Sequence, residues 1–236
     1  MTETTRNTHP LPKLALGVVV GWIALELLLR RGVVSVVVSS VGFGFTADWT
    51  ILLLGFPAMA AVLSAVTLRA GRDSSRWGYE WSLRAVVAGL LGVVVAIGLM
   101  IITSQIDAVL FGLEETTATF GTAVTEVLRR TPPLAVVFLL GNGVAVPIAE
   151  EQVWRAVVQS EFVASWGAVV GILLTAVLFA LKHVVVDGSV VRLTTLVGLG
   201  LVLGLLRHRY GTVSSVVTHI GMNLYSTAAI VLIALA

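Results

Sequence analysis

Seven long apolar stretches run through the sequence, separated by short polar connections. A helix that crosses the hydrocarbon core of a bilayer needs about 20 predominantly apolar residues, and it pairs all its backbone polar groups internally. The runs are continuous rather than alternating, which argues against a transmembrane β-barrel. The sequence therefore predicts an all-α fold, a polytopic bundle of transmembrane helices with spans at 14–40, 49–68, 83–111, 134–162, 166–187, 193–206 and 212–235.

The composition agrees with this class. Hydrophobic residues make up 57% of the 236 residues and charged residues only 12%, whereas soluble domains carry about 25% charged residues. A net charge of +2 is too small for a nucleic-acid-binding surface, so no nucleic acid partner is expected. The chain has no cysteine, which excludes disulfides, thiolate zinc sites and a cysteine nucleophile.

Two of the predicted spans are ambiguous. Glu26, Arg30 and Arg31 lie inside the span 14–40 and could divide it into two short segments, which would give eight spans. Glu26 and Arg30 are spaced i, i+4, so we expect them to form a structural ion pair. The span 193–206 has 14 residues, or about 21 Å of helix, and crosses a bilayer only with tilt or local thinning.

The domain organisation is simple. Residues 1–13 are polar and are predicted to form an exposed tail, followed by a single membrane domain over 14–236 without internal repeats or long linkers. The first apolar stretch lacks a small-residue cleavage site, so it reads as a retained signal anchor. Nine Lys and Arg residues against four, with Lys182 among the four, favour a cytoplasmic N-terminus. Division of the first span would invert this orientation.

Charged residues inside apolar spans are the informative ones, because each costs about 2.5–3.5 kcal/mol on insertion scales. The first cluster is Glu150, Glu151 and Arg155. Glu151 and Arg155 share a helix face and can pair, whereas Glu150 is rotated by about 100° and stays free for chemistry. The alternative is that both carboxylates are solvated at a helix end.

Two further clusters follow in the C-terminal half. Phe179 and His183 are one turn apart at the end of an apolar run, and His219 and Asn223 share a face within the last span. The plainer interpretations are an interfacial histidine beside Lys182 and a packing histidine in the last helix.

Together these residues suit amide hydrolysis, which needs an activated water and donors for the oxyanion. Glu150 is the candidate general base, His183 could hold the same water, and His219 with Asn223 offers donors. Three of these residues also suit a zinc site, with Glu150, His183 and His219 as ligands. The chain lacks the His-Glu-x-x-His spacing of helical zinc proteases.

The motifs Glu-Glu-x-x-x-Arg at 150–155, Phe-x-x-x-His at 179–183 and His-x-x-x-Asn at 219–223 appear in order on separate predicted helices. Together they resemble the CPBP family of CAAX proteases and bacteriocin-processing enzymes, also called Abi. The segment 198–218 is similar to the glycine-rich hairpin before the last motif of that family. The resemblance places a catalytic core at about 134–225.

The resemblance implies an intramembrane endopeptidase acting on a peptide or a prenylated protein. Glu150 would activate water with His183 as its partner, and His219 and Asn223 would form the oxyanion side. The remaining motif residues would support the site: Glu151, Arg155 and Phe179. Many members are classed as metalloproteases, while relatives that cut prenylated proteins resemble metal-independent glutamate enzymes, so no cofactor is required and zinc is the alternative.

The chain departs from the pattern at Trp154, where Phe is common, and at Ala156, where Gly usually follows the arginine. Both are lining positions, so they bear on substrate choice. The small size and the lack of organelle signals indicate a prokaryotic plasma membrane, with lipids as partners.

Two non-enzymatic hypotheses compete with this one. The chain could be a bacteriocin-immunity or scaffold protein, or a transporter that uses the buried residues as a proton relay. Both predict that Glu150→Gln causes no proteolytic defect, and transport alone predicts coupling to a proton gradient. Other residues have plainer assignments: Asp187 at a helix end, with lining of the site as its alternative, Gly200 and Gly204 in helix packing, and Glu114, Glu115 and Glu126 in a solvated loop.

Overall fold

The computed structural model describes residues 12–33, 44–112 and 124–236, with side chains from Leu53 onward in the second range. This part of the chain is helical and contains no strand, which confirms the all-α prediction for it. The elements are α1 Lys13–Leu27, η1 Leu28–Val33, α3 Gly44–Arg69, η2 Ser74–Trp77, α4 Leu83–Phe111, α6 Leu134–Leu140, η3 Gly141–Ala145, α7 Val146–Glu151, η4 Gln152–Gln159, α8 Ser160–Asp187, α9 Leu193–Tyr210 and α10 Thr212–Leu235.

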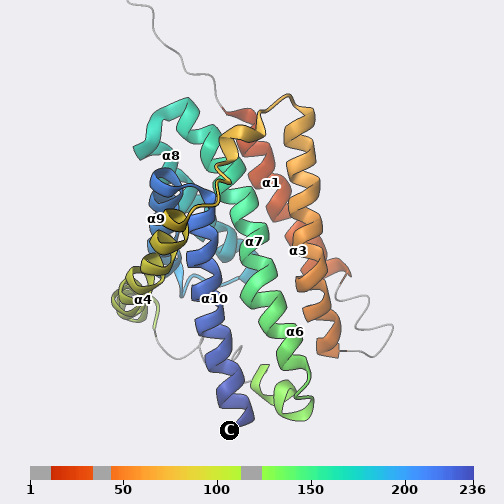
Figure 1. Cartoon of the computed structure of the whole chain (residues 1–236). Helices are drawn as coiled ribbons and strands as arrows, with labels where there is room; N and C mark the ends of the chain where they lie inside the picture. The colour runs from red at the N-terminus through yellow and green to blue at the C-terminus, as the bar shows by residue number, and fades with distance from the viewer. Residues whose placement is uncertain (1–11, 34–43, 113–123) are drawn as a thin grey trace, which may run out of the picture.

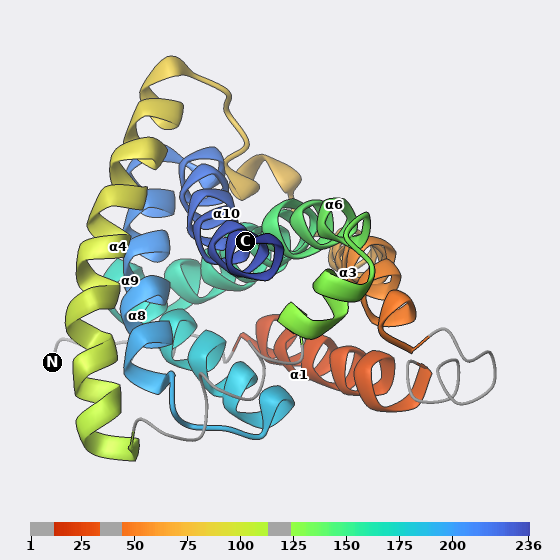
Figure 2. The same ribbon diagram turned by 90° about the horizontal axis from the view of Figure 1, so that it is seen from below.

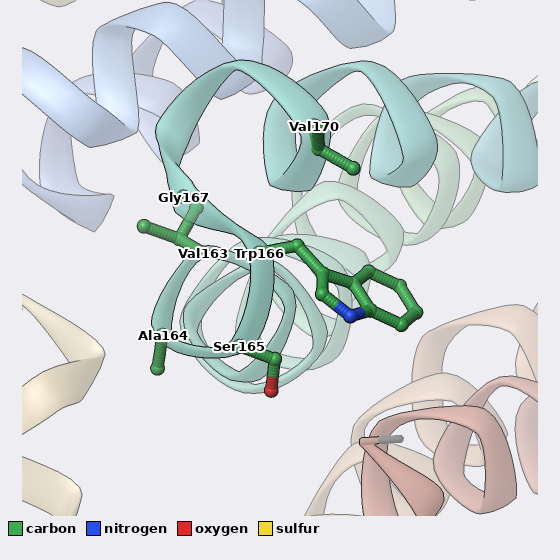
Figure 3. Close-up of a pocket in the computed structure, with 6 residues that line it drawn as sticks. All are labelled: Val163, Ala164, Ser165, Trp166, Gly167 and Val170. Atoms are coloured by element: carbon green, nitrogen blue, oxygen red, sulfur yellow. The ribbon is translucent and has the colours of Figure 1, made fainter. Parts of the chain in front are cut away.

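Within the described residues, three helical stretches are long and apolar enough to cross a membrane by length and composition: Leu83–Phe111, Leu134–Asp187 and Thr212–Leu235. The second is interrupted at Gly167, whose φ of 81° and ψ of 168° are not helical. Glycine adopts this conformation without a Cβ clash, and the helix axis changes direction sharply there (Figure 3). The predicted fourth and fifth spans meet at this bend. The structure therefore supports helices in the predicted ranges without establishing seven spans.

A long central helix organises the bundle. It is built from α6, η3, α7 and η4 and runs down the middle of the molecule, with α10 beside it (Figure 1). Helices α3 and α1 pack on one side of it, while α4 packs against α10 and α9 on the other side (Figure 2). The central helix is thus surrounded, which places its polar residues inside the bundle.

Small residues let the surrounding helices approach closely. A methyl group at Gly200 of α9 would lie 2.9 Å from Cα of Ala176 in α8, and one at Gly204 would lie 2.9 Å from Ile172. A methyl group at Gly92 of α4 would lie 2.5 Å from Oγ1 of Thr218 in α10. The Gly200 and Gly204 pair therefore serves helix packing within the bundle, as predicted.

Large apolar side chains face outward along α4. Leu90, Val94 and Val109 are 58%, 69% and 86% exposed. An apolar surface of this kind suits lipid rather than water. It agrees with the membrane character that the composition indicates.

Several sequence predictions fall outside the described residues: the tail up to residue 11, the end of the first span at 34–40, and Glu114 and Glu115. Glu126 is exposed but helical rather than in a loop, and it pairs with Arg130 at 2.8 Å. The charge count also needs correction. Lys182 and Arg155 were counted as facing water, yet both are completely buried. Without them the ratio is eight to three, which favours the same orientation.

Candidate active site

The two glutamates lie in an unusual part of the central helix. The π-helical segments η3 and η4 flank α7, and the second residue of α7 is Pro147, which has no backbone N–H to donate. Single π-helical turns are rare in proteins overall, and those that occur are often found at functional sites. Glu150 and Glu151 are 2% and 0% exposed at the end of α7. Both carboxylates are therefore inside the bundle, which excludes the solvated helix end considered above.

Three nitrogen atoms from neighbouring helices gather around Glu150. Its Oε1 accepts a hydrogen bond from Nζ of Lys182 at 2.5 Å and lies 4.0 Å from Nε2 of His183. Its Oε2 lies 3.6 Å from Nε2 of His219 on α10. The structure thus brings Glu150, His183 and His219 together. It also shows that Glu150 does not stay without a partner, contrary to the expectation from the sequence.

Glu151 connects the last motif to the first. Its Oε1 lies 2.9 Å from Nδ1 of His219, and its Oε2 lies 3.6 Å from Nε of Arg155. An ionised carboxylate only accepts hydrogen bonds, so Nδ1 of His219 carries the proton in this contact. The predicted pairing of Glu151 with Arg155 is therefore present, and Glu151 additionally orients the imidazole.

Asp187 contacts His183 from the end of α8. Its Oδ2 lies 3.4 Å from Nδ1 of His183, one helical turn earlier, and 3.0 Å from the guanidinium of Arg192. A carboxylate against one ring nitrogen fixes how the other nitrogen is presented. Sequence reasoning treated Asp187 as a helix-end residue, although its i, i+4 spacing from His183 was a signal for this contact.

Phe179 is the common neighbour of the motif residues. Its ring packs edge-on against the rings of His183 and His219, with centroids 5.1 and 6.0 Å apart. It also packs edge-on against Trp154 at 5.6 Å, and the guanidinium carbon of Arg155 lies 4.4 Å from its centroid. An aromatic face stabilises a buried cation, and the side-chain nitrogens of Arg155 make no hydrogen bond to the described residues.

Asn223 has a partner that the sequence did not suggest. Its amide donates a hydrogen bond to the backbone oxygen of Asn142 in η3 at 2.8 Å. Asn142 in turn donates to Oγ1 of Thr227 at 2.9 Å. Among the described contacts, none joins Asn223 to Glu150 or His219. A role in oxyanion binding stays a prediction for this residue.

Lys182 and Glu26 are the residues that sequence reasoning missed. Nζ of Lys182 lies 3.4 Å from Oε2 of Glu26 on α1, and both side chains are completely buried. Glu26 also pairs with Arg30 at 3.0 Å, as predicted, and accepts a hydrogen bond from the indole of Trp22 at 2.8 Å. Both charges lie in apolar runs, and each such charge needs a partner. The need for a partner is the feature of the sequence that could have pointed to these two residues, although it does not identify which helix supplies the partner.

The residues do not fit the zinc alternative. The Glu150 oxygen nearest to His183 already faces the Lys182 ammonium at 2.5 Å, and a second cation there would be repelled. The described part of the chain contains no group of three His, Cys, Asp or Glu residues placed to hold a metal ion.

An apolar groove of about 710 Å³ runs along the central helix. It lies between α3 and the segment from α6 to η4, and its lining includes Ala149 and Gln152, which precede and follow the two glutamates in the sequence. Gln152 donates a hydrogen bond to Oγ of Ser64 at 2.9 Å across the groove.

Tyr79, in the connection between η2 and α4, also lines this groove. Burial and the nearby charge of Glu151 raise the pKa of the Tyr79 hydroxyl. The side chain is 39% exposed, so water moderates this effect.

Residues 132–225 match a protein-family model described as Rce1-like, type II CAAX prenyl endopeptidase Rce1-like. The match contains all three motifs and confirms the resemblance seen in the sequence. This segment is thus similar to the Rce1-like type II CAAX prenyl endopeptidases. No similar curated protein and no similar solved structure was found. Helices α1, α3 and α4 lie outside the matched segment.

Proposed function

We propose that this chain is an intramembrane endopeptidase that hydrolyses a peptide bond with a water molecule activated by Glu150 and His183. The observation that carries the proposal is the buried Glu150 carboxylate, with imidazole nitrogens of His183 and His219 at 4.0 and 3.6 Å. Within a matched protease segment, this arrangement supplies a base and two polarising groups in a site shielded from bulk water.

The attacking water is proposed to lie between Glu150 and His183. A separation of 4.0 Å is too long for a direct hydrogen bond, but one water can bond to both atoms. Glu150 removes a proton as the water oxygen attacks the carbonyl carbon. The same proton is then delivered to the leaving nitrogen as the carbon–nitrogen bond breaks. Asp187 holds His183 in the orientation that this step requires.

His219 is proposed to stabilise the developing oxyanion. Because its Nδ1–H faces Glu151, its Nε2 donates a hydrogen bond only when both ring nitrogens are protonated. An imidazolium flanked by two carboxylates is a strong donor for an oxyanion. Asn223 uses one amide proton on Asn142, and its second can serve as a further donor. No metal takes part in this scheme.

We further propose that the substrate is a peptide with an apolar attachment, such as a prenylated C-terminus, that enters through the groove between α3 and the central helix. The apolar lining of the groove supports this substrate class. The described family acts on CAAX prenyl substrates, and the groove has the chemistry for such a chain. The protein is proposed to be multi-pass in a prokaryotic plasma membrane.

The test is cleavage of a peptide library that includes prenylated C-termini by protein reconstituted in liposomes. Wild type, Glu150→Gln and the matched control Glu126→Gln, at an exposed glutamate, are assayed with and without a strong chelator. We expect cleavage by wild type and Glu126→Gln in both conditions and none by Glu150→Gln. Loss of wild-type cleavage in chelator would restore the zinc alternative. Equal behaviour of Glu150→Gln and wild type would favour an immunity or scaffold protein, and proton-gradient coupling would favour a transporter.

A further inference from the structure

We infer that α1, which lies outside the matched family segment, completes the active site through Glu26. Glu26 acts as a positioning residue: it holds the Lys182 ammonium, which in turn holds the Glu150 carboxylate. This inference rests on the proposed function. It assigns a role in the reaction to a helix and a residue that neither the motifs nor the family match include.

Both carboxylate oxygens of Glu26 accept hydrogen bonds from described residues. Its Oε1 accepts from Nε of Arg30 at 3.0 Å, and its Oε2 accepts from Nε1 of Trp22 at 2.8 Å. The side chain is completely buried. A carboxylate with both oxygens bonded cannot rotate freely, so it offers Lys182 a rigid anchor 3.4 Å away.

Lys182 connects this anchor to the reacting carboxylate. Its Nζ lies 2.5 Å from Glu150 and 3.4 Å from Glu26, and it lies 5.4 Å from the centroid of the Phe179 ring. Two carboxylates share one ammonium, and Arg30 supplies the second positive charge. The four groups are together neutral, which is the condition under which a buried ion network persists.

The geometry gives this network a consequence for catalysis. Lys182 approaches Oε1 of Glu150, while Oε2 faces His219, and the proposed water lies toward His183. If Glu26 loses its charge, Glu150 alone holds the ammonium, which can then shift toward the position of the water. The chemical step slows, while substrate binding is unaffected because Glu26 does not line the groove.

A purely structural role for Glu26 makes a different prediction. Helix α1 is also held by apolar side chains, with Ala15, Val18, Val19 and Trp22 in the main core cluster. These contacts remain when Glu26 is replaced by an isosteric amide. A loss of kcat without a loss of helix packing would therefore come from the ion network rather than from α1 detaching.

The experiment compares Glu26→Gln, Glu26→Asp, Lys182→Met and the double variant Glu26→Gln/Lys182→Met with wild type and Glu126→Gln in liposomes. We expect Glu26→Gln to lower kcat about 10- to 100-fold, with KM within about twofold of wild type. Glu26→Asp should recover part of kcat. The double variant should be no slower than Lys182→Met alone, because both changes interrupt one chain of contacts. Wild-type kcat in Glu26→Gln, or additive losses in the double variant, would overturn the inference.

Thermal unfolding of the same four variants separates this inference from the proposed function. A coupling between Glu26 and Lys182 in the double-mutant cycle is expected whatever the substrate is, because it depends only on their contact. If wild type cleaves nothing, the proposed function fails, and the presence of this coupling still supports the network. If wild type cleaves and the cycle shows no coupling, the positioning role of Glu26 is overturned while the proposed function stands.

Discussion

Neutralising Glu151 should destabilise the protein far more than neutralising a surface glutamate. Glu151 and Arg155 are both completely buried and lie 3.6 Å apart. In Glu151→Gln the guanidinium keeps its charge, with the Phe179 ring at 4.4 Å as its nearest remaining support. Removing one partner of a buried pair costs about 3–5 kcal/mol. For a chain of this length that corresponds to a decrease in Tm of about 6–20 °C.

The assay is thermal unfolding in detergent, followed by circular dichroism, together with peptide cleavage. The control is Glu126→Gln, which breaks a pair with Arg130 whose side chains are 53% and 76% exposed, and it should cost less than about 1 kcal/mol. The double variant Glu151→Gln/Arg155→Met removes both charges and should recover most of the Tm, because no uncompensated charge remains.

Measuring cleavage by the same variants distinguishes a loss of stability from a loss of catalysis. The neutral double variant should stay inactive despite its recovered Tm, because the Glu151 carboxylate that holds Nδ1 of His219 at 2.9 Å is gone. A Tm of Glu151→Gln within 2 °C of the Glu126→Gln control would refute the reasoning, and so would an active double variant.

Three further predictions follow from the same geometry. Asp187→Asn removes the carboxylate 3.4 Å from Nδ1 of His183 and should lower kcat about tenfold with little change in KM. The exposed control Asp73→Asn should leave kcat unchanged. Equal kcat values for the two variants would contradict the orienting role of Asp187. Ala61→Trp fills the groove beside α3 and should raise KM for prenylated peptides severalfold, while short unprenylated peptides are cut as before. An equal loss of activity on both kinds of peptide would show that the groove does not bind the apolar attachment. The raised pKa of Tyr79 means that the folded state keeps its proton to higher pH than the unfolded state, so this stability is complete below the unfolded pKa of about 10 and is lost as pH rises through the higher folded pKa. Alkaline unfolding should therefore begin at higher pH in Tyr79→Phe than in wild type, and identical curves would exclude the effect.

Much of this fold follows from patterns that are local in sequence. Apolar runs locate the helices, and the i, i+4 spacings predict the contacts within one helix, such as Glu26 with Arg30 and Glu151 with Arg155. The break between the fourth and fifth predicted spans lies at Gly167, where a positive φ is needed. The convergence of Glu150, His183 and His219 was predicted from three motifs together rather than from any one of them.

The remainder depends on how helices dock, which local patterns do not encode. Lys182 has the neighbours of an interfacial charge in the sequence, and only the packing of α1 against α8 places Glu26 beside it. Asn223 was expected to share a helix face with His219 and to offer a donor to the oxyanion, and its bond to Asn142 in a π-helical turn is a contact that the sequence does not predict. The number of membrane spans also stays a prediction, because helix length and hydropathy support three among the residues that the structure describes.

The central claim is that water, activated by Glu150, attacks the peptide bond. Cleavage in water enriched in heavy oxygen, followed by mass spectrometry of the products, tests this claim most directly. The account predicts one heavy oxygen atom in the newly formed C-terminal carboxylate with wild type, the same result in the presence of a strong chelator, and no product with Glu150→Gln. Product from Glu150→Gln at the wild-type rate, or product without heavy oxygen, would contradict it.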